Sequence, residues 1–468
     1  MVFSSATFMF LFLPIFFILY YLAPFKAKNV VLCIFSLIFY AWGEPIYIVL
    51  MIFSSVVDYC NGRCMEKFYR HRKVFLCISI LVNLSLLGFF KYSTLLVNTI
   101  DHIFGLSFAA PNPALPIGIS FYTFQTMSYS IDVYRKEVET EHNFLDFMAY
   151  VSMFPQLIAG PIVRYKTVNR ELHQRTINLD GFGQGAYRFL RGLFKKVIIA
   201  NSVGAIFTDV SALQLKSQSA LTLWIAILAF SLQIYFDFSG YTDMAIGIGK
   251  MIGFTFPENF NYPYFADTVS DFWRRWHMSL TTWFRDYVYI PLGGSRKGTP
   301  RTIINIFIVW ALTGIWHGAE WNFMLWGIYF GILLLLEKFV IGKFLQKLPS
   351  FLRHIYVCVL AMIGWVIFSF EKVSDIFTYI RGMFHFGNFA DDRAMFLLHE
   401  YKRILLIAAV FAMPVIPWAK KQIKKRVKNS IALNVIYAVT TLIMLGLFVL
   451  SVAMIISESY NPFLYFRF

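Results

Sequence analysis

Long runs of uncharged, apolar residues divide this sequence, and they constrain its fold more than any other feature. The clearest is 431–456, "IALNVIYAVTTLIMLGLFVLSVAMII", which contains no charged side chain. About 20 apolar residues in a helix cross the hydrocarbon core of a bilayer, so this run can span a membrane with some tilt. Only 15% of the residues are charged, whereas soluble domains carry roughly 25%. The pattern predicts a polytopic membrane protein.

The apolar runs predict an all-α fold with about ten to twelve transmembrane helices. Several runs are short or contain Gly, Pro or Trp, so we expect some helices to be broken or re-entrant. Irregular backbone survives at membrane depth only inside protein or beside a water-filled cavity, which favours an internal chamber. We expect one domain over 1–468, with a catalytic core at about 114–336. The runs lie near 5–23, 30–43, 45–59, 74–99, 114–133, 144–163, 219–236, 302–316, 321–336, 354–370, 395–418 and 431–456.

The basic residues predict how the chain is oriented. A net charge of +16 is explained by cytoplasmic loops facing anionic lipid, and we expect no nucleic-acid partner. Lys26 and Lys28 follow the first apolar run, which places the N-terminus outside. The stretch 420–428, "KKQIKKRVK", has six basic residues and no acidic one. It should be cytoplasmic, and the tail that follows 431–456 should be extracytoplasmic.

Neither the cysteines nor the acidic residues predict a metal site. The five cysteines are an odd and scattered set, which does not form a disulfide framework. Cys60 and Cys64 have no histidine cluster beside them. Asp237 ends an apolar run and Asp243 follows six residues later, but they lack the clustered ligands of a metal centre. We expect no metal and no permanently bound cofactor, and we expect Asp237 to form hydrogen bonds at a helix end.

A histidine between apolar runs marks the first candidate site. In "TGIWHGAEWNFMLWG" (313–327), His317 and Glu320 lie between the runs 302–316 and 321–336, of 15 and 16 residues. Each run is shorter than the ~20 residues of a full span, so the joint should be an interfacial turn or a break that lines a chamber. Ionisable residues within a membrane are functional candidates by default. We therefore interpret His317 as a catalytic group.

A second histidine borders an aromatic stripe in 270–294, "SDFWRRWHMSLTTWFRDYVYIPLGG". Trp273 and later aromatic residues recur at three- and four-residue spacing, which predicts an amphipathic helix. Such a helix could lie on the membrane surface, anchored by Trp and Arg, or it could carry His277 into a site. The arginines on its other faces are Arg274, Arg275 and Arg285.

Four segments, in this order, resemble the membrane-bound O-acyltransferase family. They are "FDFSGYTDMAIG", "PENFNYPY", "FWRRWHMSLTTWFRDYVYIPLGG" and "GIWHGAEWNFMLWG", and "FPQLIAGPIVRY" upstream is also similar. Within the family they are similar to the bacterial alginate and peptidoglycan O-acetyltransferases. The resemblance covers nearly the whole chain and is densest from 232 to 327. One such motif would be a weak signal, but the ordered set is highly specific.

The resemblance implies a ring of tilted and broken helices around a thin central region with a tunnel. It also implies that His317 is the catalytic histidine of the family and His277 the second one. The same motifs supply residues that we expect to bind the donor or substrate, or to support the site. These are Asp237, Tyr241, Asn259, Trp273, Arg274, Arg275, Arg285 and Trp316.

The chemistry of acyl transfer suits these residue types independently. Moving an acyl group from a thioester to a hydroxyl needs a base, and a buried imidazole is neutral at pH 7. A closed, apolar site also protects the thioester from hydrolysis. His277 could orient the donor or stabilise a developing oxyanion. The nearby arginines could hold the phosphates of a coenzyme A-type donor.

The last eight residues, "NPFLYFRF", resemble the C-terminal acyl-relay motif of the teichoic acid D-alanylation machinery and related acyltransferases. The resemblance implies that Tyr465 receives the acyl group outside the membrane. The alternative is an ordinary aromatic tail at the membrane interface.

Together these features predict an O-acetyltransferase of the bacterial cytoplasmic membrane, in contact with membrane lipid. It would take acetyl from acetyl-CoA or another acyl thioester and pass it across the membrane to an extracytoplasmic polysaccharide. A separate periplasmic acetyltransferase would complete the transfer, because this chain has no G-x-S-x-G nucleophile elbow of its own. Three alternatives stay open: teichoic acid D-alanylation by the same fold, a secondary transporter and a scaffold without chemistry. The identity of the polysaccharide stays open as well.

Overall fold

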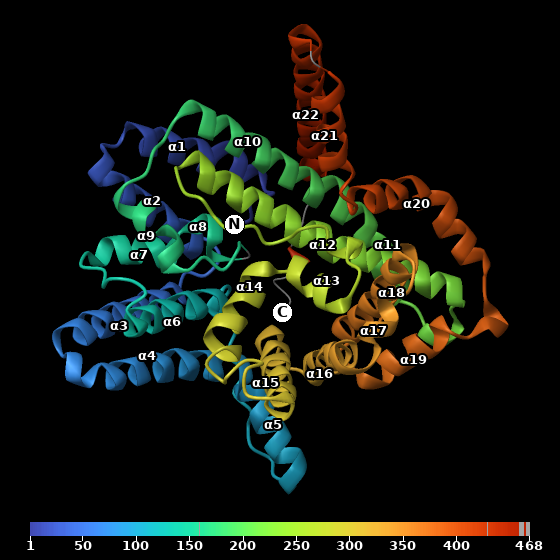
Figure 1. Cartoon of the computed structure of the whole chain (residues 1–468), viewed down its shortest axis with the longest axis horizontal. Coiled ribbons are helices and arrows are strands. Elements are labelled where there is room, and N and C mark those ends of the chain that lie inside the picture. The colour runs from blue at the N-terminus through green and yellow to red at the C-terminus, as the bar shows by residue number, and fades with distance from the viewer. Residues whose placement is uncertain (159, 428, 458–462, 465–468) are drawn as a thin grey trace. The chain divides into compact units, whose positions relative to one another are not determined.

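The computed structural model describes residues 1–468 except 159, 428, 458–462 and 465–468 (Figure 1). Its described part consists of helices and their connections, with no strand. The all-α prediction is therefore confirmed. The predicted acyl-relay residue, Tyr465, lies outside the described residues.

The described chain groups into two compact units. The first comprises Met1–Phe189 and Thr242–Glu258, and the second Leu190–Tyr241 and Asn259–Leu464. Two helices contribute to both units, α10 (Leu179–Phe194) and α12 (Ala220–Met251). The other helices of the first unit are α1 (Leu13–Leu22), α2 (Phe25–Ala41), α3 (Ile48–Lys67), α4 (Arg72–Leu87), α5 (Ser93–Phe104), α6 (Ile119–Arg135), α7 (Phe144–Ser152), α8 (Phe154–Leu157) and α9 (Tyr165–His173). Those of the second are α11 (Asn201–Ser211), α13 (Val269–Arg275), α14 (Met278–Phe284), α15 (Thr299–His317), α16 (Trp321–Leu336), α17 (Gly342–Leu345), α18 (Ser350–Ser369), α19 (Val373–Met383), α20 (Asp392–Phe411), α21 (Val415–Arg426) and α22 (Ser430–Ser457).

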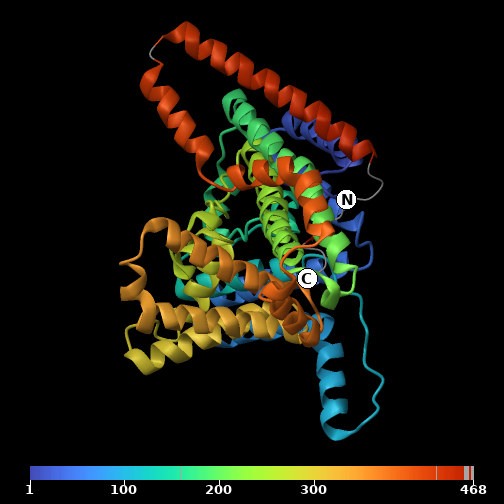
Figure 2. The ribbon, with the colours of Figure 1, turned by 90° about the vertical axis from the view of Figure 1, so that its right-hand side faces the viewer.

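Six helices among the described residues are long and apolar enough to cross a membrane. A bent pair, Asp392–Phe411 and Val415–Ile423, turns by 64° and makes a seventh if it counts as one span; these helices, with α22, are coloured red in Figure 2. The count is lower than the ten to twelve expected, because several apolar runs form shorter helices. The six are Ile48–Lys67, Tyr69–Phe104, Ala220–Met251, Trp321–Leu345, Ser350–Ser369 and Ser430–Ser457.

A buried polar cluster joins α3, α4 and α6 in the first unit. The carboxylate of Asp58, which is fully buried, accepts hydrogen bonds from Ser79 and from Nδ2 of Asn83, the latter at 2.6 Å. Ser130 Oγ donates a third at 3.0 Å. Asn83 Oδ1 accepts one from Ser54 Oγ at 2.8 Å. Polar groups in an apolar environment must find partners within the protein, so this cluster fixes the three helices to one another.

In the second unit, α15 and α16 pack closely as an antiparallel hairpin (Figure 1). Gly314 lies against the carbonyl oxygen of Phe323, and Gly327 lies against that of Trp310, so that a Cβ atom at either glycine would clash with backbone. Small residues allow two helix backbones to approach in this way. The hairpin confirms the predicted break, and it places His317 as the last residue of α15.

The second arm of this hairpin is longer than the sequence analysis predicted. The apolar run ends at Leu336, but the helix continues through a π-helical turn, Glu337–Ile341, into α17. Trp321–Leu345 is then 25 residues long and can span a membrane. The charge of Glu337 does not end the helix because its buried carboxylate accepts the backbone N–H groups of Val269 and Ser270, at 2.6 and 3.0 Å.

Candidate active site

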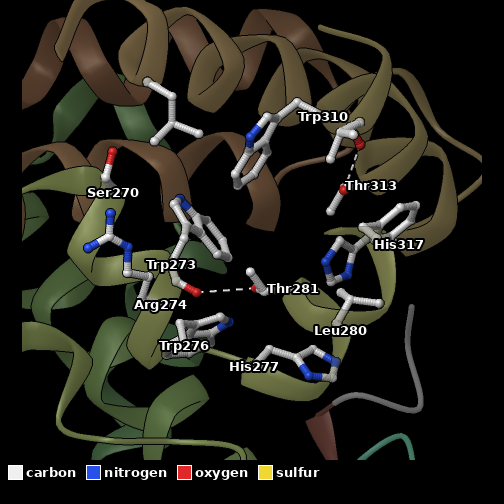
Figure 3. Close-up of a pocket in the computed structure, with 13 residues that line it drawn as sticks. Ser270, Trp273, Arg274, Trp276, His277, Leu280, Thr281, Trp310, Thr313 and His317 are labelled. Carbon is white, nitrogen blue, oxygen red and sulfur yellow. Dashed lines mark hydrogen bonds between the residues drawn. The ribbon is translucent and has the colours of Figure 1, made fainter. Parts of the chain in front are cut away.

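A pocket of about 260 Å³ lies in the second unit and is lined mainly by residues of α13, α14 and α15 (Figure 3). His277 and His317 both line it, at the opposite end of the drawn view from Ser270 and Arg274. Most of its wall is aromatic or aliphatic, and few of its side chains are charged. The lining residues are Ser270, Trp273, Arg274, Trp276, His277, Leu280, Thr281, Phe284, Val309, Trp310, Thr313, His317 and Leu334.

The backbone at His277 explains how this side chain enters the pocket. The single amphipathic helix predicted over 270–294 is wrong. The structure has two short helices, α13 and α14, separated at Trp276 and His277. His277 adopts the left-handed conformation, with φ 45° and ψ 53°, which is uncommon and strained for a residue with a Cβ atom. Strained backbone of this kind clusters at functional sites, and here it directs a nearly fully buried imidazole into the pocket.

Asn259 holds this break in place. Its backbone oxygen accepts the N–H of Met278 at 3.0 Å. Its side-chain oxygen accepts both the backbone N–H and the hydroxyl of Ser279, at 3.1 and 2.9 Å. Nδ1 of His277 lies 3.1 Å from the same oxygen. The first turn of α14 and the ring of His277 therefore depend on one asparagine, which was expected from the sequence to bind the donor or substrate or to support the site.

These contacts also fix the tautomer of His277. A backbone N–H can only donate, so the atom of Asn259 that faces Ser279 must be the oxygen. Nδ1 of His277 must then donate to it, which leaves Nε2 as the basic nitrogen. Burial lowers the pKa of His277, which lies between short helices and outside the candidate spans, to about 3. The ring is therefore neutral at pH 7, and Nε2 accepts hydrogen bonds. This geometry suits a hydroxyl group better than the oxyanion considered in the sequence analysis.

His317 lies at the end of α15 within an aromatic shell. Its ring centroid is 4.9 Å from that of Trp326, 5.0 Å from that of Trp316 and 5.4 Å from that of Phe368. Trp316 also lies 6.0 Å from His277, so it contacts both imidazoles. Gly318 follows in an extended conformation, where a Cβ atom would collide with the ring of Phe323. The glycine thus permits the sharp end of α15 that presents His317 to the pocket.

The three candidate arginines occupy different places. Arg274 lines the pocket and is exposed. Nε of Arg275 pairs with Asp271 at 2.8 Å, and Nε of Arg285 pairs with Asp286 at 2.8 Å; neither of these two arginines lines the pocket. Of the three, Arg274 is the one placed to meet an anionic ligand there.

Trp273 forms part of the pocket wall beside Arg274. Its indole ring packs against Trp310, Trp326 and Phe330, with centroids 4.8, 5.3 and 4.8 Å apart. Its Nε1 atom is buried and has no hydrogen-bond partner among the described residues. Trp273 is therefore a rigid wall element with one polar atom for which the described protein supplies no acceptor.

Asp237 and Tyr241 lie on α12 and contact the C-terminal tail. Asp237 forms a buried ion pair with Lys196, with Nζ 2.6 Å from Oδ1, and its Oδ2 accepts the backbone N–H of Leu464 at 2.7 Å. The ring of Tyr241 lies 4.9 Å from that of Phe463. Lys196 was not predicted from the sequence as a site residue. An acidic residue within an apolar helix signals that a basic partner is needed, but not which one.

Comparison with known proteins places this site in a family context. A sequence profile of the membrane-bound O-acyltransferase (MBOAT) family matches residues 119–375. The "Probable alginate O-acetylase AlgI" of Azotobacter vinelandii is 38% identical over the full length of both chains. The protein of the same name from Pseudomonas aeruginosa is 42% identical, over 83% of this chain and 75% of its own. The peptidoglycan O-acetyltransferase of Helicobacter pylori is 34% identical, over 82% of this chain and 80% of its own.

Proposed function

Because this chain belongs to the membrane-bound O-acyltransferase family, we propose that it transfers acetyl groups from a cytoplasmic thioester towards an extracytoplasmic polysaccharide. It is a multi-pass membrane acyltransferase. The relatives named alginate O-acetylase and peptidoglycan O-acetyltransferase support acetyl as the group and a polysaccharide as the final acceptor.

One observation carries the proposal: the buried side chains of His277 and His317 line the same pocket, whose wall is mainly aromatic and aliphatic. Acyl transfer from a thioester needs a proton acceptor in surroundings that exclude water. A secondary transporter, the alternative from another class, would need neither two histidines in one pocket nor a fixed tautomer at one of them.

In the proposed transfer, His317 removes the proton from an attacking hydroxyl group. The hydroxyl oxygen forms a bond to the acetyl carbonyl carbon, the carbon–sulfur bond breaks, and the thiolate leaves with the proton from the imidazolium. Nε2 of His277 accepts a hydrogen bond from the same hydroxyl group and orients it. His317 is assigned as the base because the pKa of His277, about 3, makes His277 a weak one; general bases work best with a pKa near the working pH.

The donor is proposed to be acetyl-CoA or another acyl thioester with anionic phosphates. Arg274 is exposed at the pocket, where a guanidinium group can hold phosphate oxygens. The apolar wall next to it suits a flexible, weakly polar arm that ends in the thioester. In this arrangement the thioester lies towards the histidines.

Tyr465 is proposed as the first acceptor of the acetyl group. It directly follows Leu464, whose backbone N–H binds Asp237. The side chain before it, Phe463, packs beside Phe238 with ring centroids 6.1 Å apart, and Phe238 lies 4.8 Å from His277. Phe463 and Leu464 therefore lie near the site, and Tyr465 is the next residue in the sequence. An acetyl-tyrosine ester outside the membrane could pass its acetyl group to a separate periplasmic acetyltransferase, which would modify the polysaccharide.

Transfer of labelled acetyl tests this proposal directly. The protein, purified in detergent, is incubated with acetyl-CoA that carries a ¹⁴C-labelled acetyl group. Release of coenzyme A thiol and covalent label on the protein are measured together. We expect both, and we expect peptide mass spectrometry to locate the label on Tyr465. Thiol release at the rate of a blank without protein would overturn the choice of donor, and a label on any other residue would overturn the relay.

A further inference from the structure

A buried ion pair lies at the point where the C-terminal tail meets α12. Asp237 and Lys196 are 1% and 4% exposed, and the Nζ–Oδ1 distance is 2.6 Å. Lys196 belongs to the π-helical segment Lys195–Ala200 that follows α10. An acidic residue buried in an apolar helix is unfavourable without a partner, and Lys196 supplies the opposite charge.

The ion pair leaves one carboxylate oxygen for the tail. Oδ1 of Asp237 faces Lys196, while Oδ2 accepts the backbone N–H of Leu464 at 2.7 Å. A hydrogen bond from an N–H group to a carboxylate is stronger than one to a neutral acceptor. Leu464 lies 227 residues after Asp237, so this bond is a long-range contact that attaches the tail to α12.

A neighbouring aromatic contact strengthens the same attachment. Phe463 is 1% exposed. Its ring lies 4.9 Å from that of Tyr241 and 6.1 Å from that of Phe238. Tyr241 follows Asp237 by four residues and Phe238 by three, so in α12 its side chain neighbours both of them. Phe238 also connects the tail with the candidate site, because its ring meets that of His277 edge to face, with ring centroids 4.8 Å apart.

From these contacts we propose that Asp237, oriented by Lys196, is a positioning residue that anchors the C-terminal tail beside His277. The inference rests on the proposed function, in which the tail serves acyl transfer, and it adds the residues that hold the tail in place. The partner is a segment of this chain, recognised through one backbone N–H and one aromatic ring. Loss of the anchor should lower the fraction of molecules in which the tail can react.

Digestion from the C-terminus measures the anchor without reference to chemistry. The full-length protein in detergent is treated with a carboxypeptidase, and its mass is followed over time. In the wild type, the peptidase should remove the residues after Leu464 and leave Leu464 on the chain. In Asp237→Ala it should continue past Phe463, at a rate about tenfold higher or more, because a bond to a charged acceptor is lost. Asp391→Ala is the matched control, since Asp391 accepts a bond from Thr222 of α12 at 2.7 Å; its tail should stay protected.

Exchanging the charges of Lys196 and Asp237 distinguishes a role in anchoring the tail from a role in stabilising the fold. The double variant Lys196→Asp/Asp237→Lys restores an ion pair, but a lysine at position 237 cannot accept an N–H. We expect it to keep a cooperative unfolding transition and yet to lose both tail protection and acetyl transfer. The variant Asp237→Asn keeps an oxygen acceptor, so it should retain more protection than Asp237→Ala. A charge-exchanged protein with a protected tail and normal activity would show that the pair is only structural.

The anchor and the acyl relay can fail separately. Tyr465→Phe keeps the N–H of Leu464 and the ring of Phe463, so its tail should resist the peptidase even though transfer is lost. If Tyr465→Phe transfers acetyl normally while Asp237→Ala exposes the tail, the relay is wrong and the anchor stands. If the tail of Asp237→Ala remains protected, the anchor is wrong whatever the chemistry of Tyr465.

Discussion

The side-chain oxygen of Asn259 lies 3.1 Å from Nδ1 of His277, 18 residues further along the chain. This contact decides the tautomer of the imidazole, and with it the role that His277 can take. Asn259 also connects the segment before α13 with the first turn of α14, so a single residue contacts both the imidazole and the start of that helix.

Replacing Asn259 by aspartate should change the pH dependence of transfer. A carboxylate beside Nδ1 favours the charged imidazolium and raises the pKa of His277 from about 3. Protonated His277 cannot accept a hydrogen bond at Nε2. The transfer rate of Asn259→Asp should therefore fall at acidic pH and recover above the new pKa. This fall on the acidic side of the pH profile, its acid limb, should lie at higher pH than in the wild type.

The comparison variant is Asn259→Ala, which removes the acceptor without adding a charge. It should lower activity at every pH while the acid limb stays in place. Rates of thiol release between pH 5 and pH 9 distinguish the two outcomes. An unchanged acid limb in a folded Asn259→Asp protein would show that the protonation state of His277 does not control transfer.

Removing the imidazole of His317 should abolish transfer without loss of the protein. General-base catalysis contributes about 10²–10⁴-fold, so His317→Ala should lose at least about 100-fold in rate. The smaller side chain also leaves a gap beside Trp326 and Phe368, which makes His317→Gln the second variant to test. The control is His399→Ala, because His399 is exposed on α20. Normal polysaccharide acetylation in cells that accumulate His317→Ala would overturn the assignment of the base.

The sequence predicted the α15–α16 break, because two apolar runs, each shorter than a full span, met at His317 and Glu320. It did not predict that the helix continues beyond α16, since the apolar run ends at Leu336 whereas the helix continues through Glu337–Ile341 into α17. The reason is non-local: the carboxylate of Glu337 accepts N–H groups at the start of α13. A hydropathy pattern cannot show which distant backbone groups satisfy a charge.

The same limit explains the error over 270–294. Its periodicity favours one amphipathic helix, and periodicity carries no information about Asn259, which caps α14 from outside the segment. Both histidines named from the sequence line the pocket: His317 was singled out between two short apolar runs, and His277 at the border of an aromatic stripe. The residues that were missed, Lys196 and Glu337, act through single long-range contacts. Membership of the acyltransferase family, predicted from ordered motifs, is confirmed.

The glycines of the α15–α16 hairpin should be sensitive to a single added methyl group. Gly314→Ala places a Cβ atom against the backbone carbonyl of Phe323, which cannot easily move. Overpacking of this kind destabilises by about 1–3 kcal/mol, and it should displace His317, three residues later. Gly446→Ala on α22 is the control, because nothing lies within 4 Å of the added atom, and alanine favours helix by up to ~1 kcal/mol. Thermal unfolding in detergent should show a lower transition temperature for Gly314→Ala and not for Gly446→Ala.

Labelling of single cysteines should establish the orientation of α22. In a background without the five native cysteines, Arg426→Cys and Ser457→Cys mark the residues before and at the end of this helix. The basic stretch predicts that position 426 is cytoplasmic. An impermeant maleimide should label Ser457→Cys in intact spheroplasts and Arg426→Cys only after permeabilisation. The reverse pattern would place the tail inside and remove the reason for a relay across the membrane.

Tyr465→Phe tests whether the tail carries the acetyl group. The hydrocarbon core is ~30 Å thick, and a charged donor crosses it far less readily than an acetyl group passed through a protein. A tyrosine hydroxyl has a pKa of about 10 and is a poor nucleophile unaided, so His317 must act as its base. The phenyl ester that forms is more reactive than an alkyl ester, which suits onward transfer. Removing this one oxygen should abolish polysaccharide acetylation while the aromatic packing and the amount of protein stay unchanged.

The matched variant is Tyr460→Phe, five residues earlier and outside the motif, and it should acetylate normally. The two variants differ only in which hydroxyl group is removed, so a general loss of tail polarity would affect both. Acetylation of the cell-surface polysaccharide, measured as base-released acetate per unit of polymer, compares them directly. If Tyr465→Phe matches the wild type, the tail only anchors the end of α22 and the acetyl group crosses by another route. If Tyr465→Phe abolishes acetylation while Tyr460→Phe does not, and His317→Ala abolishes it too, both results agree with one transfer to the hydroxyl of Tyr465 with the imidazole of His317 as base.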